Sequence, residues 1–176
     1  KEGASGWYKL WKGLGLMLLL YGALMLIGLA GGNTDPLQPI KGLAVSGGPA
    51  VQQEHLQFKT VKTIADLERE VKAASAAGKT VMLDFYADWC VSCKEFEKYV
   101  FSDPQVLAAL SNTVNLQADV TANDEADQAL LKQFRLIGPP GIIFYDRSGA
   151  ELSAYRIVGY TEASAFAGHV ERAFAQ

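Results

Sequence analysis

The sequence predicts an α/β domain with a mixed central sheet flanked by helices, preceded by one transmembrane helix and a linker. Three observations support this fold class. Residues 13–32 contain no charged side chain, strand-like and helix-like patterns alternate from residue 55 onward, and two strand-like segments near the end flank a turn. Alternating strands and helices indicate a parallel sheet covered on both faces, and the late hairpin adds an antiparallel edge.

Residues 1–32 are predicted to form a transmembrane helix with a basic and aromatic cytoplasmic flank. The charge-free run, residues 13–32, would span about 30 Å as a helix, which matches the hydrocarbon core of a bilayer. The flanking residues are Trp7, Tyr8, Lys9, Trp11 and Lys12. Because lysines mark the cytoplasmic side, we expect everything after residue 32 to lie outside the cytoplasm. The length of the run disfavours a cleaved signal peptide and a buried core helix.

The rest of the chain divides by composition. Residues 33–54 carry three prolines and three glycines without a sustained period, which predicts a flexible linker. A globular domain is then expected over residues 55–176. The chain has 16 basic and 19 acidic side chains. Residues 1–32 hold three of the basic and one of the acidic side chains, so the remainder of the chain holds 13 basic and 18 acidic ones. A mildly acidic domain lacks the excess of basic residues that is typical of nucleic-acid-binding proteins.

Strands and helices are expected to alternate in the globular domain. Strand 80–87 has apolar residues on both faces, which is typical of a central parallel strand. The other expected strands are 55–61, 113–121, 141–146 and 153–160, and the expected helices are 64–77, 90–100, 102–112, 123–135 and 161–176.

Several residues mark the expected helix ends. Thr63, with Asp66 three residues later, predicts a capping box, and Gly78 predicts the end of the same helix. The remaining expected caps are Ser102 or Asp103, before Pro104 in a first turn, and Thr161.

The two cysteines of the chain, Cys90 and Cys93, are separated by two residues where strand 80–87 runs into a helix. The first turn of a helix has unpaired N–H groups and a partial positive charge, which favour a thiolate. Cys90 is therefore the expected attacker in disulfide exchange, and Cys93, one turn later, the resolving thiol. A strand-to-helix CxxC motif in an α/β pattern is a specific signal for this chemistry.

Two other interpretations of the cysteine pair are weaker. A zinc site would need His55 and His169, which do not lie at finger-like spacing, so no metal is expected. A purely structural disulfide would close a very small loop and constrain little of the unfolded chain.

Two acidic residues and a tryptophan lie near the pair. Asp84, inside the apolar strand, should be partly desolvated with a raised pKa, so that it could exchange protons with the resolving thiol. Glu97 follows Cys93 by four residues and should share a helix face with both sulfurs, unless it is simply a solvated surface residue. Trp89 precedes the attacker and could cover the site or lie at its rim.

The segment before the late hairpin contains Pro139 and Pro140 between two glycines, which predicts a constrained turn. If Pro140 is cis, its loop can approach the cysteines and present backbone groups to a substrate chain.

Together these residues resemble the thioredoxin superfamily. LDFYADWCVSCK, residues 83–94, matches its strand, buried Asp, Trp and cysteine pair, and IGPPG, residues 137–141, falls where the superfamily keeps its cis-proline loop. Residues 81–106, after a membrane helix and linker, are similar to the C-terminal region of the DsbD family of thiol:disulfide interchange proteins. The implied fold is thioredoxin-like.

This narrower resemblance implies a protein-disulfide reductase of the bacterial inner membrane, with its catalytic domain in the periplasm. Electrons from cytoplasmic thioredoxin would pass through a cysteine pair in a transmembrane domain of the same full-length protein. The electrons would then reach the thioredoxin-like domain of residues 55–176, which would reduce an N-terminal periplasmic domain that serves disulfide isomerases and cytochrome c maturation factors. No cofactor is implied beyond the redox-active Cys90–Cys93 disulfide.

The resemblance also assigns roles. Cys90 is the nucleophile, Cys93 the resolver, Asp84 and Glu97 the acidic modulators, and Pro140 the cis-proline.

One departure from the family pattern concerns the proline loop. The family usually has a non-proline residue before the cis-proline and often Thr after it, whereas this chain has Pro139 and Gly141. We therefore expect a differently shaped substrate-facing loop.

Two alternative functions remain open at the level of sequence. One is an independent single-span thioredoxin-like reductase of the cytochrome c maturation type. The other is a binding or chaperone module whose disulfide is only structural. The direction of electron flow depends on the reduction potential, which residues 91–92 between the cysteines do not reveal.

Overall fold

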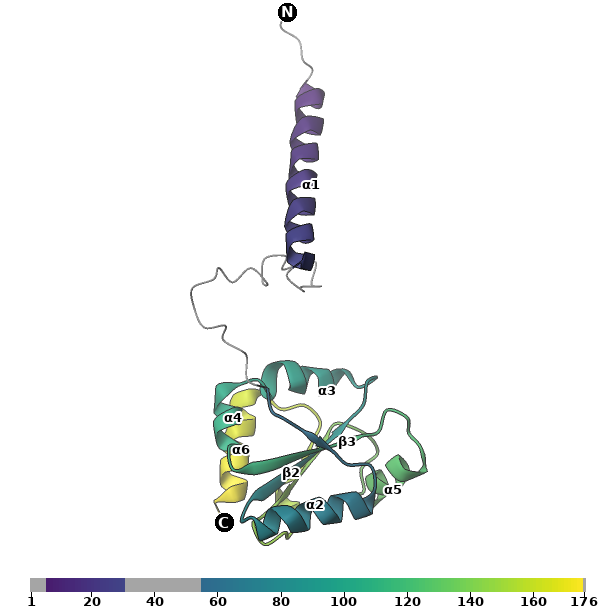
Figure 1. Cartoon of the computed structure of the whole chain (residues 1–176), viewed down its shortest axis with the longest axis vertical. Coiled ribbons are helices and arrows are strands. Elements are labelled where there is room, and N and C mark those ends of the chain that lie inside the picture. The colour runs from purple at the N-terminus through teal and green to yellow at the C-terminus, as the bar shows by residue number, and fades with distance from the viewer. Residues whose placement is uncertain (1–5, 31–54, 176) are drawn as a thin grey trace, which may run out of the picture. The chain divides into compact units, whose positions relative to one another are not determined.

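Two units make up the chain in the computed structural model, Lys1–Gln52 and Gln53–Gln176. The structure describes residues 6–30 of the first unit and 55–175 of the second (Figure 1). The predicted linker over 33–54 lies outside the described residues.

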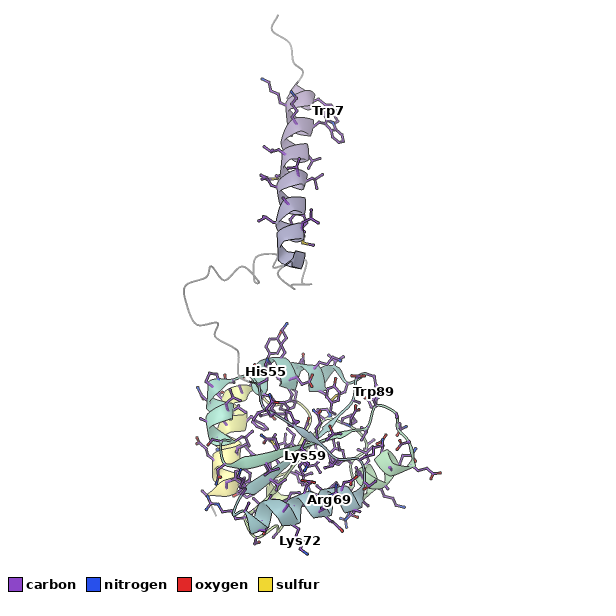
Figure 2. All side chains as sticks on the ribbon, in the orientation of Figure 1. Trp7, His55, Lys59, Arg69, Lys72 and Trp89 are labelled. Atoms are coloured by element: carbon purple, nitrogen blue, oxygen red, sulfur yellow. A yellow bond between two sulfur atoms is a disulfide. The ribbon has the colours of Figure 1, made fainter. Side chains whose placement is uncertain are left out.

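The first unit contains helix α1, Gly6–Ala30. It starts well before the charge-free run and includes the basic and aromatic flank. Among the described residues, α1 is the helix that is long and apolar enough to cross a membrane, and residues 9–26 are its candidate spanning segment. Its described apolar side chains project on more than one side, and most of its described side chains are exposed (Figure 2). A helix that is apolar all round needs apolar surroundings, so α1 is a candidate membrane span.

The second unit is built on a five-stranded sheet with the order β1-β3-β2-β4-β5. The strands are β1 Lys59–Thr60, β2 Thr80–Tyr86, β3 Thr113–Asp119, β4 Gly141–Tyr145 and β5 Ile157–Val158. β3 runs parallel to β1 and β2, whereas β4 is antiparallel to both β2 and β5. The predicted mixed sheet is confirmed, with β2 in the centre. β2 is buried on both faces up to its last residue, Tyr86.

Helices cover both faces of this sheet (Figure 1). Their bounds are α2 Ile64–Ala76, α3 Val91–Glu95, the π-helix η1 Phe96–Val100, α4 Pro104–Ala109, α5 Glu125–Gln133, the 3₁₀ turn η2 Ser153–Tyr155 and α6 Ala163–Phe174. Leu83 of β2 belongs to a buried cluster with residues of α2 and α5. Met82, on the opposite face of β2, belongs to a second cluster with residues of η1, α4 and α6. The two cores explain why β2 reads as a continuous apolar run.

Most of the predicted helix ends are confirmed. Thr63 and Asp66 form a capping box at α2, and Gly78 has a φ of +66°, a conformation that glycine adopts without steric cost. Of the two expected caps before α4, Asp103 accepts the hydrogen bond, from the backbone of Gln105. Thr161 was the wrong choice for α6. The helix follows Glu162, which makes no side-chain cap.

Two predicted strands are much shorter in the structure. Of segment 55–61, Lys59 and Thr60 alone form a strand. The backbone N–H of Leu56 instead donates to the carbonyl of Phe101 (3.2 Å), and the Phe58 ring packs on Phe101. The predicted strand 153–160 becomes the turn η2 followed by the two-residue β5. In both cases tertiary packing overrides the alternating pattern.

The predicted helix 90–100 is also modified. After α3 the chain continues as η1, where Phe101 donates its N–H to the carbonyl of Phe96 (2.8 Å), five residues earlier. This π segment turns Phe96, Val100 and Phe101 into the same buried cluster. Single π turns inside helices occur often at functional sites.

Candidate active site

Cys90 and Cys93 form a disulfide at the start of α3, with their Cα atoms 5.3 Å apart. Cys90 is the N-cap residue, and its Sγ accepts a hydrogen bond from the backbone N–H of Cys93 (3.2 Å). Both side chains are largely buried, but Cys90 is 7% exposed and Cys93 only 2%. Cys90 is therefore the more exposed cysteine of the pair, and its sulfur has an N–H donor, which suits it to carry a thiolate.

Local turns bring the pair to the carboxyl end of the central strand. After β2 ends at Tyr86, the N–H of Cys90 donates to the carbonyl of Ala87 (3.0 Å), which turns the chain into α3. Cys93 Sγ then lies 3.8 Å from the carbonyl oxygen of Phe85. The resolving sulfur thus rests on the strand residue next to Asp84.

Asp84 is 2% exposed, in the centre of the sheet. Burial raises its pKa to about 7, and the neighbouring Glu97 carboxylate also raises it. One interaction opposes this shift. Gln117 of β3 donates a hydrogen bond from Nε2 to Asp84 Oδ2 (3.1 Å), which lowers the pKa of Asp84. The net result is a buried carboxyl group that changes its protonation state near neutral pH.

Glu97 lies half-buried in η1 rather than in a regular α-helix. Its charge adds to the effect of burial in raising the pKa of Asp84, and it also adds to the effect of burial on the pKa of Tyr86. Glu97 thus belongs to the electrostatic surroundings of Asp84.

Sequence reasoning missed Gln117. Its partner is set by the β2–β3 register, which places Asp84 opposite Gln117. The available signal was the alternation of β3, in which Asn115, Gln117 and Asp119 share the face that bears Asp84 on β2.

The proline loop lies beside the same strand end. The peptide bond between Pro139 and Pro140 is cis. Gly141 pairs with Phe85 across the antiparallel β2–β4 ladder, and Gly159, next to β5, donates its N–H to the carbonyl of Pro140 (3.1 Å). This register places Pro139 and Pro140 next to the residues that lead to the disulfide.

Gly141, where the family often has Thr, is closely packed. A Cβ atom at this position would lie 2.7 Å from Cδ1 of Leu136. Leu136 therefore occupies the space that a side chain at position 141 would need.

Trp89 is 60% exposed at the rim of the site, and Figure 2 shows it at the edge of the second unit. Its indole N–H donates to the carbonyl of Thr121 (3.3 Å). Val91, inside the CxxC motif, and Ile137, before the proline loop, are also exposed apolar residues. Apolar side chains that remain exposed next to a reactive group are typical of a surface that receives another molecule. Sequence reasoning identified Trp89 but not Val91 or Ile137.

Metal ligation finds no support in the geometry. Among residues 6–30 and 55–175, no three His, Cys, Asp or Glu side chains are grouped so that they could hold a metal ion. His169, one of the two histidines considered, instead has Nε2 2.8 Å from the carbonyl oxygen of Tyr155.

Comparison with protein families and solved structures gives a consistent result. The model of a thioredoxin-like family matches residues 62–147. The crystal structure of the oxidised C-terminal domain of DsbD from Neisseria meningitidis is 36% identical, with a TM-score of 0.56. The match covers 65% of this chain and 98% of that one. A thioredoxin from Thermus thermophilus, 24% identical with a TM-score of 0.53 over 66% of this chain and 87% of that one, shares the fold.

Curated relatives are longer proteins. The thiol:disulfide interchange protein DsbD of Ralstonia nicotianae is 47% identical over 94% of this chain, which corresponds to 27% of that protein. Its counterpart in Escherichia coli is 52% identical over 69% of this chain and 21% of that protein. The chain thus spans about a quarter of the length of the curated relatives that it matches.

Proposed function

Because the chain belongs to the DsbD family of thiol:disulfide interchange proteins and matches their C-terminal domain, we propose that it is a membrane-tethered protein-disulfide reductase. The observation that carries this proposal is the Cys90–Cys93 disulfide itself. It lies at a helix start, with the sulfur of the more exposed cysteine accepting an N–H hydrogen bond and a buried carboxyl group of pKa about 7 on the adjacent strand. These are the parts that dithiol–disulfide exchange requires.

The exchange proceeds in two half-reactions. An upstream dithiol attacks the Cys90–Cys93 disulfide and becomes a disulfide, leaving two thiols on this chain. The Cys90 thiolate then attacks a partner disulfide, which forms a mixed disulfide and releases one partner thiolate. Cys93 attacks Cys90 in turn, which releases the second partner thiolate and restores the starting disulfide.

Asp84 supports the proton transfers of this cycle. Cys93 must lose its proton to attack and must regain one after reduction. A buried carboxyl group with a pKa of about 7 is half-protonated at neutral pH, so it can serve as acceptor in one step and donor in the other. Its position next to Phe85, whose carbonyl oxygen lies 3.8 Å from Cys93 Sγ, supports this role.

The full relay is proposed from the family. Electrons reach Cys90–Cys93 from a cysteine pair in the transmembrane domain of the same full-length protein, and cytoplasmic thioredoxin feeds that pair. They leave to its N-terminal periplasmic domain and from there to periplasmic thiol–disulfide proteins. Residues 1–32, with α1, would form the inner-membrane anchor, residues 33–54 the linker, and residues 55–176 the periplasmic domain. The apolar α1 and the lysines at its start support this orientation.

The proposal is tested with two cysteine variants and a disulfide partner. Cys90→Ser should abolish turnover, because it removes the attacking thiol. Cys93→Ser should accumulate a mixed disulfide, because the second thiol is missing. Turnover without any adduct in Cys93→Ser would contradict the assignment of the resolver. A wild-type disulfide that resists a mild dithiol and supports no turnover would favour a binding module instead.

A further inference from the structure

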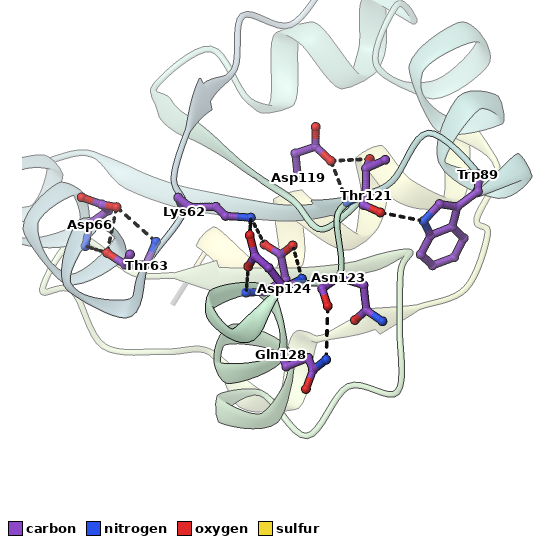
Figure 3. A network of polar contacts seen from close by, with 10 residues as sticks. Lys62, Thr63, Asp66, Trp89, Asp119, Thr121, Asn123, Asp124 and Gln128 are labelled. Atoms are coloured by element: carbon purple, nitrogen blue, oxygen red, sulfur yellow. Dashed lines mark hydrogen bonds and ion pairs between the residues drawn. The ribbon is translucent and has the colours of Figure 1, made fainter.

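Thr121 contacts both residues that precede the nucleophile, Asp88 and Trp89, and Figure 3 shows its contact with Trp89. The backbone carbonyl of Thr121 accepts the indole N–H of Trp89 (3.3 Å). Its hydroxyl oxygen accepts the backbone N–H of Asp88 (2.9 Å). Because Asp88 and Trp89 lead directly to Cys90, one residue of the loop after β3 holds the segment that carries the reactive sulfur.

Thr121 is itself fixed by Asp119, the last residue of β3. Asp119 Oδ1 accepts hydrogen bonds from the Thr121 hydroxyl (2.5 Å) and from the Thr121 backbone N–H (2.9 Å). Between them, Val120 donates its N–H to the carbonyl of Tyr86 (2.8 Å), which ties the loop to the end of β2.

The far end of this loop is anchored separately. Lys62 forms an ion pair with Asp124 at the start of α5 (Figure 3), and a second ion pair with the buried Asp127 of the same helix. Residues 119–124 are thus held at both ends.

We propose that Thr121 is a positioning residue for protein substrates, because it sets the placement of Trp89 beside the disulfide. Trp89 is 60% exposed, and the hydrogen bond from its indole N–H to the Thr121 carbonyl restrains the ring. A large ring that is already held in place loses less side-chain entropy when a polypeptide packs against it. The inference rests on the proposed reductase function and adds a residue that touches neither sulfur.

This role makes a specific kinetic prediction. A small disulfide needs access to Cys90 but no docking surface, whereas a protein disulfide must also settle against Trp89. Thr121→Val keeps the shape and the carbonyl but removes the hydroxyl that accepts from Asp88 and donates to Asp119. It should therefore slow transfer to a protein while leaving transfer to a small molecule unchanged.

The test uses the full chain in detergent, reduced beforehand and freed of excess reductant. Each dithiol transfers its two electrons to one disulfide, either of insulin or of the small aromatic disulfide dithiobis(nitrobenzoate). We expect Thr121→Val to lower the second-order rate constant with insulin by about fivefold, which is the scale of the hydrogen bonds lost with the hydroxyl, with less than about twofold change for the small disulfide. Thr121→Ser, which keeps the hydroxyl, should restore the rate with insulin.

Thr60→Val is a matched control, since Thr60 is exposed on β1 and its side chain makes no hydrogen bond to any of the described residues 6–30 and 55–175. It should leave both rate constants unchanged. Equal losses with both disulfides in Thr121→Val, or no loss with either, would overturn the inference. Failure of the wild-type dithiol to reduce insulin at all would instead overturn the proposed function.

Discussion

The side-chain amide of Gln117 on β3 donates a hydrogen bond to the buried carboxyl group of Asp84 on β2, at 3.1 Å. This contact stabilises the charged form of Asp84 against the larger, opposite effect of burial. The balance between the two sets a pKa of about 7.

Removal of the amide donor should raise the pKa of Asp84 above its wild-type value. In Gln117→Leu the Asp84 carboxylate loses its hydrogen bond but stays buried, so the neutral form of Asp84 is favoured. The measurement is an NMR titration of the Asp84 carboxyl carbon in the oxidised protein. Gln105→Leu, at an exposed position on α4, serves as control. An unchanged or lowered pKa of Asp84 in Gln117→Leu would show that the contact does not act on the carboxyl group.

Asp84→Asn should make the domain more stable at alkaline pH. The folded-state pKa of about 7 lies above the ordinary value of 3.8, so the folded state retains a proton that the unfolded state has lost. The contribution of Asp84 to the free energy of unfolding is therefore complete below pH 3.8, and it is lost as the pH rises through about 7. The gap of about three units at about 1.4 kcal/mol each gives roughly 4 kcal/mol as an upper bound.

Urea unfolding of the oxidised chain between pH 4 and pH 8 measures this effect. The free energy of unfolding should fall with pH in the wild type and much less in Asp84→Asn. Parallel curves for the two proteins would mean that Asp84 does not carry the pH dependence.

Glu97→Gln should lower the pKa of Asp84 and, in the reduced protein, that of the Cys90 thiol. Both effects follow from removal of a nearby negative charge that disfavours further negative charge. The pH profile of the alkylation rate reports the thiol, and the carboxyl titration reports Asp84. Glu95→Gln, two residues earlier in the same helical segment, is the matched control. If the Glu97→Gln and Glu95→Gln profiles coincide, the modulating role of Glu97 is refuted.

Gly141→Ala should destabilise the domain by about 1 kcal/mol, because the new Cβ atom overlaps the side chain of Leu136. The overlap involves the end of a flexible, half-buried side chain, so the cost stays modest. In a Leu136→Ala background the same substitution should cost much less. A double-mutant cycle from urea unfolding gives the coupling between the two positions. Additive effects would locate the cost of Gly141→Ala elsewhere.

Features that depend on residues close together in the chain were predicted well. The capping box of Thr63 and Asp66 is confirmed, as is the helix end at Gly78. The N-cap position of Cys90 likewise needs only a strand, a turn and the first turn of a helix. Such features rest on contacts within about four residues, which a sequence displays directly.

Features that depend on packing between distant segments were predicted poorly. Segment 55–61 alternates as a strand should, yet Leu56 and Phe58 pack against Phe101 and leave a strand of two residues. The π turn η1 after α3 left no signal in the sequence, because it follows from how Phe96 and its neighbours fit a core built from other helices.

The sequence by itself determined the apolar helix, the reactive cysteine pair and the buried acid in the central strand, since each follows from local composition, spacing or periodicity. The tertiary structure alone decided how strongly Asp84 holds its proton, because Gln117 reaches it across a strand register. It also placed Pro140 at the end of β2 that leads to the disulfide, and the Thr121 carbonyl within hydrogen-bond distance of the Trp89 indole. These contacts join residues about thirty or more positions apart, and the pairing of strands brings them together.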